Sequence, residues 1–135
     1  KNSALTEHVN YQSTIHLFLE IESTEKIQDP LLDIRIKTQD GVYFAHAMNR
    51  YIKSENTVLH KGKNVIHCRL QNKLQPGKYS FTIGVHRSDG VTLDFVEDIL
   101  DFHVLNVADE GKDNFTYNFN FGLVRFESEW EIQLT

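Results

Sequence analysis

The residues best placed to bind a ligand lie on the outward faces of two segments in which apolar and polar residues alternate. Segments 14–22 and 65–71 each place every second side chain away from the core. The candidate binding residues on these faces are His16, Phe18, Glu20, His67 and Arg69. An aromatic ring beside such polar groups suits a sugar, because the ring covers the apolar face of a pyranose while planar polar groups bind its hydroxyls. The same residues would also form a cross-strand ladder that shields itself, with Phe18 covered by the N-terminal arm.

A second candidate surface lies on the segment "YSFTIGVH", residues 79–86. Its large apolar residues form one face of a strand, and the opposite face carries short or weakly charged side chains. Together with neighbouring strands of this sheet, which lies opposite the first, it offers the candidate residues Arg35, Thr82, His86 and His103, with Gly84 leaving a shallow depression. A strand that only needed solubility would carry lysine and glutamate there. The sequence therefore predicts that either a ligand or another strand or loop of the chain covers residues 80–86.

Other chemistry is weakly indicated. The seven histidines are spread over separate segments and form no His-x-His or His-Glu-x-x-His pattern. Three of them could still converge in space as metal ligands, but exposed strand histidines explain the spacing better. The acidic run "LDFVEDILD" lacks the glycine-spaced aspartates of a calcium loop. Cys68 has core parity and is interpreted as a small buried hydrophobe. We therefore predict no catalytic residue, no metal and no cofactor.

The elements that position these residues are short strands. Alternation or turn chemistry indicates strands over 14–22, 32–36, 42–47, 66–70, 79–86 and 102–105, and a late hairpin over 118–121 and 123–126 that 130–134 could extend. Asp40-Gly41, Gln75-Pro76-Gly77 and Asp89-Gly90 supply turns between them. Residues 48–61 and 92–98 show no firm period. Short strands at this spacing predict an all-β fold, an immunoglobulin-like antiparallel sandwich of about eight strands, with a closed barrel as the alternative.

Length and charge limit the function classes. The chain has 135 residues, which predicts a single domain over 1–135 with an N-terminal arm at 1–13 and terminal strands at 115–135. The net charge is -5 and there is no basic stripe, so nucleic acid is not the expected partner. No apolar run approaches the roughly 20 residues that span a bilayer. The single cysteine fits a reducing compartment.

The order of several motifs resembles a known family. "DPLLDIRIKTQDGVYFAHAMNR" is followed by "CRLQNKLQPGKYSFTIGVH", then "DFVEDILDFHVLN", and finally "GLVRFESEW". This order is similar to the C-terminal domain of Wzt-type ATPase subunits from bacterial polysaccharide ABC exporters, over about residues 15–130. The resemblance implies an immunoglobulin-like sandwich that binds carbohydrate. It further implies recognition of the non-reducing end of an O-antigen chain before export.

The same resemblance implies partners and a location. Family members pair or exchange their last strands in a homodimer, which would place residues 122–130 in an interface. The resemblance also implies work on the cytoplasmic side, at the inner membrane, together with the ATPase and transmembrane subunits of the transporter. This chain lacks the Gly-Lys-Ser/Thr loop of an ATPase. The family supplies no motif for individual ligand residues, so the candidate residues depend on strand parity alone.

Three functions are compatible with the sequence. The first is a non-catalytic module that binds the O-antigen polysaccharide. The second is a protein-interaction or accessory sandwich, which an upstream signal peptide rather than an upstream ATPase would favour. The third is a carbohydrate-active enzyme, which would need paired carboxylates in a cleft. No two such groups stand out in the sequence, so the first function is the expectation.

Overall fold

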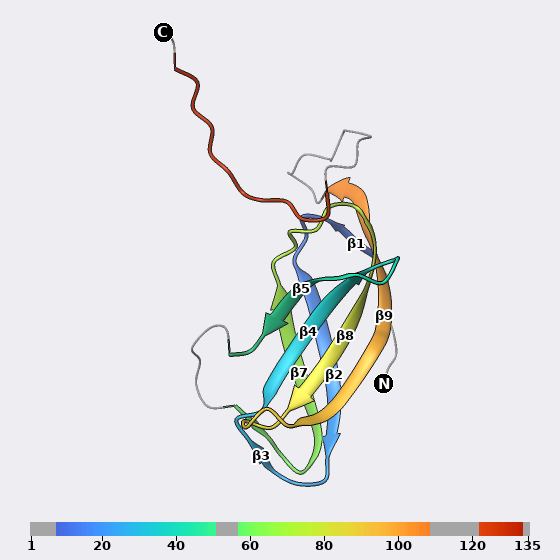
Figure 1. The fold of residues 1–135 in the computed structure, drawn as a ribbon, viewed down its shortest axis with the longest axis vertical. Helices are drawn as coiled ribbons and strands as arrows, with labels where there is room; N and C mark the ends of the chain where they lie inside the picture. The colour runs from blue at the N-terminus through green and yellow to red at the C-terminus, as the bar shows by residue number, and fades with distance from the viewer. Residues whose placement is uncertain (1–7, 51–56, 109–121, 134–135) are drawn as a thin grey trace.

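The computed structural model of the chain describes residues 8–50, 57–108 and 122–133 (Figure 1). In these residues there is no helix, and the strands are β1 (His8–Tyr11), β2 (Ile15–Ser23), β3 (Ile27–Gln28), β4 (Leu31–Thr38), β5 (Tyr43–Met48), β6 (Val58–Leu59), β7 (Gly62–Leu70), β8 (Gly77–His86) and β9 (Thr92–Ala108). The all-β fold predicted from alternation is confirmed. Both candidate surfaces therefore consist of strand faces.

The strands form two layers. One layer is a five-stranded sheet in the order β1-β9-β8-β4-β5, and the other is the pair β2-β7, with β3-β6 as a short separate ladder. Figure 1 shows β2 and β7 behind β4 and β8. All pairs are antiparallel except β1 with β9, which run parallel. The sheets are separate, so the structure is a sandwich and not the closed barrel that the sequence left open.

The core lies between the two layers. It is built from the inward residues of β2, β4, β8 and β9, which include Ile15, Leu17, Ile34, Ile36, Tyr79, Phe81, Ile83, Phe102 and Val104. The rings of Phe81 and Phe102 stack with centroids 4.2 Å apart. Cys68 packs against this core, and burial raises the pKa of its thiol. The interpretation of Cys68 as a small hydrophobe agrees with this environment.

Two parts of the chain differ from the sequence prediction. Residues 92–98, for which no period was found, belong to the 17-residue strand β9. The late hairpin is wrong in its second half, since residues 122–133 form only the isolated bridge between Leu74 and Val124. Its first half, 118–121, lies outside the described residues. Alternation alone is insufficient there because a strand also needs a neighbouring strand to accept its hydrogen bonds.

Candidate functional site

The residues selected from the sequence come together on the outer face of β2 and β7. The register places His16 opposite Arg69 and Phe18 opposite His67, and Glu20 lies opposite Val65. All five candidate side chains are exposed, and Phe18 is 67% exposed. The predicted sharing of one surface is therefore confirmed. Their role in binding stays a prediction.

Contacts within this group are mostly mutual. The rings of Phe18 and His67 stack at 4.3 Å with 13° between their planes, and His16 Nδ1 lies 2.9 Å from His67 Nε2. Desolvation, and then the charges of Arg69 and His16, lower the pKa of His67. We call His16, Phe18 and His67 the outer stack. One face of the Phe18 ring is therefore occupied by His67.

The second candidate surface, on the five-stranded sheet, is centred on a buried carboxylate. The side chain of Asp33 is 2% exposed although it lies on the outer face of β4. His86 Nε2 lies 2.7 Å from Asp33 Oδ2, while Arg35 Nε and His46 Nε2 lie 3.6 and 3.9 Å from Oδ1. We call Asp33, Arg35, His46 and His86 the polar cluster. These partners offset the cost of burying the charge.

Gly84 makes this arrangement possible. A Cβ atom on Gly84 would lie 3.0 Å from both carboxylate oxygens of Asp33 and 2.8 Å from His86 Nε2. Gly84 stands opposite Asp33 on β4 and opposite Phe95 on β9. The predicted shallow depression at Gly84 is therefore filled by the chain itself, with the Asp33–His86 pair. Thr82, another residue of this predicted face, is fully buried.

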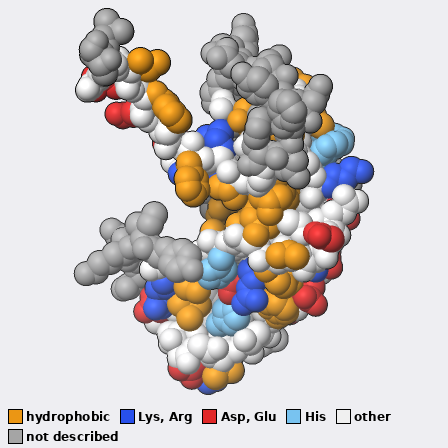
Figure 2. Space-filling model, turned by 45° about the horizontal axis from the view of Figure 1, so that its top comes forward, with side chains coloured by type: hydrophobic (Ala, Val, Ile, Leu, Met, Phe, Trp, Pro, Cys, Tyr) orange, Lys and Arg blue, Asp and Glu red, His pale blue; other side chains and the backbone are white. Residues whose placement is uncertain are grey.

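Two aromatic rings stand beside the polar cluster. The Arg35 guanidinium carbon lies 5.2 Å from the ring centre of Phe95 and 5.9 Å from that of Tyr43. Tyr43 and Phe95, which we call the aromatic pair, are 38% and 40% exposed. The Tyr43 hydroxyl donates to Glu97 Oε2 at 2.7 Å, which fixes its ring across the sheet. Figure 2 shows histidine and basic side chains next to hydrophobic ones on this side of the molecule.

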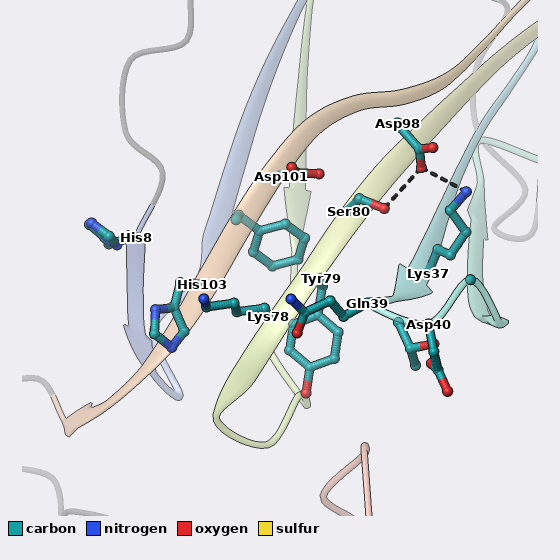
Figure 3. Close-up of a pocket in the computed structure, with 13 residues that line it drawn as sticks. His8, Lys37, Gln39, Asp40, Lys78, Tyr79, Ser80, Asp98, Asp101 and His103 are labelled. Atoms are coloured by element: carbon teal, nitrogen blue, oxygen red, sulfur yellow. Dashed lines mark hydrogen bonds and ion pairs between the residues drawn. The ribbon is translucent and has the colours of Figure 1, made fainter.

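A hollow of about 900 Å³ lies farther along the same face (Figure 3). Its lining includes Lys37, Lys78, Ser80, Asp98, Asp101 and His103. Lys37 Nζ lies 2.8 Å from Asp98 Oδ1, which also accepts a hydrogen bond from Ser80. The bond between Lys37 and Asp98 raises the pKa of Lys37 and lowers that of Asp98. His103, predicted to join Arg35 and His86, therefore lines a separate part of the face.

The acidic run is brought onto this face by an irregularity in β9. Phe81 pairs with Leu100 and Ile83 with Val96, so β9 carries extra residues between these points, and Asp98 has a φ of 53°. Glu97 and Asp98 bond to Tyr43 and Lys37. Within ranges 8–50, 57–108 and 122–133, no three His, Cys, Asp or Glu side chains gather as metal ligands. In the same ranges no helix has the length and apolarity needed to cross a bilayer.

Sequence reasoning missed Asp33, Tyr43 and Phe95. All three have outward parity, and Asp33 stands between the core residues Leu32 and Ile34 in the pattern. The available signal was a glycine flanked by core residues on the adjacent strand, since Gly84 marks a close approach. Burial of a carboxylate on an outer face depends on side chains from three strands. A single strand pattern does not contain that information.

Comparisons with known proteins bear on this fold. The profile of the family described as "Wzt C-terminal domain" matches residues 1–126. A solved structure described as "Crystal structure of the C-terminal domain of wzt" superposes with a TM-score of 0.73 and 18% identity, covering 93% of this chain and 73% of that chain. No curated protein matches the chain. The structural likeness shows a shared fold, and the profile extends over nearly all of the sequence.

Proposed function

The chain belongs to the family of Wzt C-terminal domains, and we propose that it is a non-catalytic module that binds an O-antigen polysaccharide for export by an ABC transporter. On this proposal it works at the cytoplasmic side of the inner membrane with the ATPase and transmembrane subunits. The proposed module is a single domain, residues 1–135. The glycan binds on the outer face of the five-stranded sheet.

The observation that carries the proposal is the polar cluster beside the aromatic pair. Sugars combine an apolar ring face with hydroxyls that both donate and accept hydrogen bonds. Phe95 and Tyr43 offer half-exposed rings, and Arg35 offers donors between them. The Arg35 guanidinium packs beside both rings and faces Asp33 Oδ1 at 3.6 Å, which limits the side-chain entropy lost when a sugar binds.

The mechanism is selection among glycans. A chain with the correct non-reducing terminus forms hydrogen bonds with the site, whereas a chain lacking it leaves polar groups unpaired. A solvent-open site such as this one gives weak affinity, on the order of micromolar to millimolar, because few contacts with the glycan are fully buried. Weak binding suits a step in which the polymer must be released.

The first prediction concerns binding itself. Calorimetric titration of the 135-residue chain with the O-antigen polysaccharide of its source organism is expected to show saturable binding in this affinity range. Dextran serves as the neutral control and is expected to give no saturable heat. Polymer with its terminal residue removed tests the terminus. Equal affinity for both forms would contradict terminal recognition, and equal behaviour of dextran would contradict the proposal as a whole.

The outer stack is the second candidate glycan surface. Phe18 is more exposed than either ring of the aromatic pair, and Arg69 and Glu20 stand near it. We rank it below the five-stranded face because its rings contact one another. An NMR titration with the polysaccharide, followed residue by residue, separates the two surfaces.

We also propose that segment 122–133 pairs with another copy of the chain. Phe126, Trp130 and Ile132 are 84%, 88% and 93% exposed, and they share the parity of a strand face. Figure 1 shows this segment leaving the body of the sandwich. An extended segment with exposed apolar side chains is a template for pairing with another chain. We propose that the partner is a second copy, which would make a homodimer.

The second prediction tests this pairing. Light scattering of the wild-type chain is expected to give the mass of a dimer. The double variant F126S/W130S is expected to shift the population to monomer, because the apolar contact area of the paired segment is removed. The variant F18S removes an exposed aromatic side chain from β2, in the two-stranded layer, and is expected to leave the dimer intact. A monomeric wild-type chain would contradict the pairing proposal.

A further inference from the structure

The guanidinium of Arg35 is held in one orientation. Phe95 lies on one side at 5.2 Å and Tyr43 on another at 5.9 Å. Tyr43 of β5 is itself fixed by its hydrogen bond to Glu97 of β9, two strands across the sheet beyond β4 and β8. A planar guanidinium packed against aromatic rings loses little freedom when it binds a ligand. Arg35 is therefore organised before any ligand arrives.

The donors of Arg35 are only partly used. Its Nε faces Asp33 Oδ1 at 3.6 Å, which is an ion-pair contact longer than a hydrogen bond. Within the described part of the chain, no protein acceptor receives a hydrogen bond from its two terminal nitrogens, and the side chain is 38% exposed. The edge of the guanidinium that forms paired hydrogen bonds is thus available to a ligand.

The chemistry of the Arg35 side chain itself favours an anionic partner. Asp33 is the single carboxylate within the polar cluster, and it is shared among Arg35, His46 and His86. Of the nearby carboxylates, Asp98 pairs with Lys37, and Glu97 accepts a hydrogen bond from the Tyr43 hydroxyl. Arg35 is the member of this cluster whose side chain keeps a positive charge at every physiological pH. An anionic group of the ligand would accept charge-assisted hydrogen bonds from the two terminal nitrogens of Arg35.

We propose that Arg35 binds an anionic group of the glycan, a carboxylate or a phosphate ester, through its two terminal nitrogens. This inference rests on the proposed glycan-binding function and names the class of sugar that the same site takes. The planar fork matches the two oxygens of either group. Phe95 and Tyr43 cover the adjoining sugar ring, and His46 stands beside the bound group.

The third prediction uses three small probes that differ in one group. The full chain is titrated by NMR with methyl α-D-glucoside, methyl α-D-glucuronide and methyl α-D-glucoside 6-phosphate, each to about 100 mM at constant ionic strength. At least one anionic probe is expected to bind about tenfold or more tighter than the glucoside, as a charge-assisted bidentate contact provides. Comparison of the two anionic probes identifies whether carboxylate or phosphate is preferred.

Variants assign the preference to Arg35. R35Q is expected to abolish the preference, and R35K to lose most of it because lysine keeps the charge without the fork. K63Q, which removes a positive charge from β7, is expected to retain it. Equal affinity for all probes, no shift with any anionic probe, or an unchanged preference in R35Q would overturn the inference. If the polysaccharide still binds although one of these results is obtained, the proposed glycan-binding function stands and only the role of Arg35 is rejected. If the polysaccharide does not bind either, both proposals are rejected.

Discussion

Replacement of Phe81 by alanine is expected to lower the free energy of unfolding by about 3–5 kcal/mol. Phe81 is 2% exposed and its ring stacks on Phe102, so truncation removes packing at the centre of the core. Phe81 also stands opposite Ile36 on β4 and Leu100 on β9, so the truncation affects a position shared by three adjacent strands. Urea unfolding monitored by circular dichroism measures the change.

The matched control for this change is F18A. It removes the same ring from the outer stack, where Phe18 is 67% exposed. The expected loss is below about 1 kcal/mol, because little area returns to water and only a surface contact is lost. Similar losses in the two variants would show that the layers have been assigned to the wrong faces of β2 and β8.

The second large effect is expected for D33N. The change removes the charge that holds Arg35, His46 and His86, and it places an amide donor where one oxygen stood. Losing a hydrogen bond to a charged group costs about 1.5–3 kcal/mol, and buried polar atoms left without partners add to it. We expect a stability loss of that size. Affinity for the polysaccharide should fall as well, because Arg35 is no longer oriented.

The control for D33N is D89N. Asp89 pairs with Arg87 at 2.8 Å, but both side chains are more than half exposed. An exposed ion pair contributes about 0–1 kcal/mol, so D89N should unfold nearly as the wild type does and bind glycan equally well. A D33N variant that matched D89N in both measurements would contradict the role assigned to the polar cluster.

The sequence predicted the fold wherever a strand kept a regular period. The alternation of Ile15 and Leu17 with His16 and Phe18 placed β2 and its faces correctly, and the residues of β7 that oppose them followed. Prediction failed where the backbone departs from that period. The extra residues in β9 near Asp98 disrupt the alternation, so a strand of 17 residues was not recognised.

The candidate site was only partly accessible to sequence reasoning. Parity placed Arg35, Thr82 and His86 on one face, as the structure has them. Parity could not show that Asp33 is buried on that face, because its burial is produced by side chains from β4, β5 and β8 together. The contact of Arg35 with Phe95 likewise spans strands far apart in the chain. Such contacts depend on register, which a single sequence does not specify.

The central claim is that glycan binds over the outer face of β4, β5, β8 and β9. The most direct test is to follow the polysaccharide titration residue by residue with backbone and side-chain NMR. The account predicts the largest shifts at Arg35, Tyr43, His46 and Phe95, with residues 15–23 and 62–70 nearly unchanged. Shifts centred on His16, Phe18 and His67, with the five-stranded face unaffected, would contradict it.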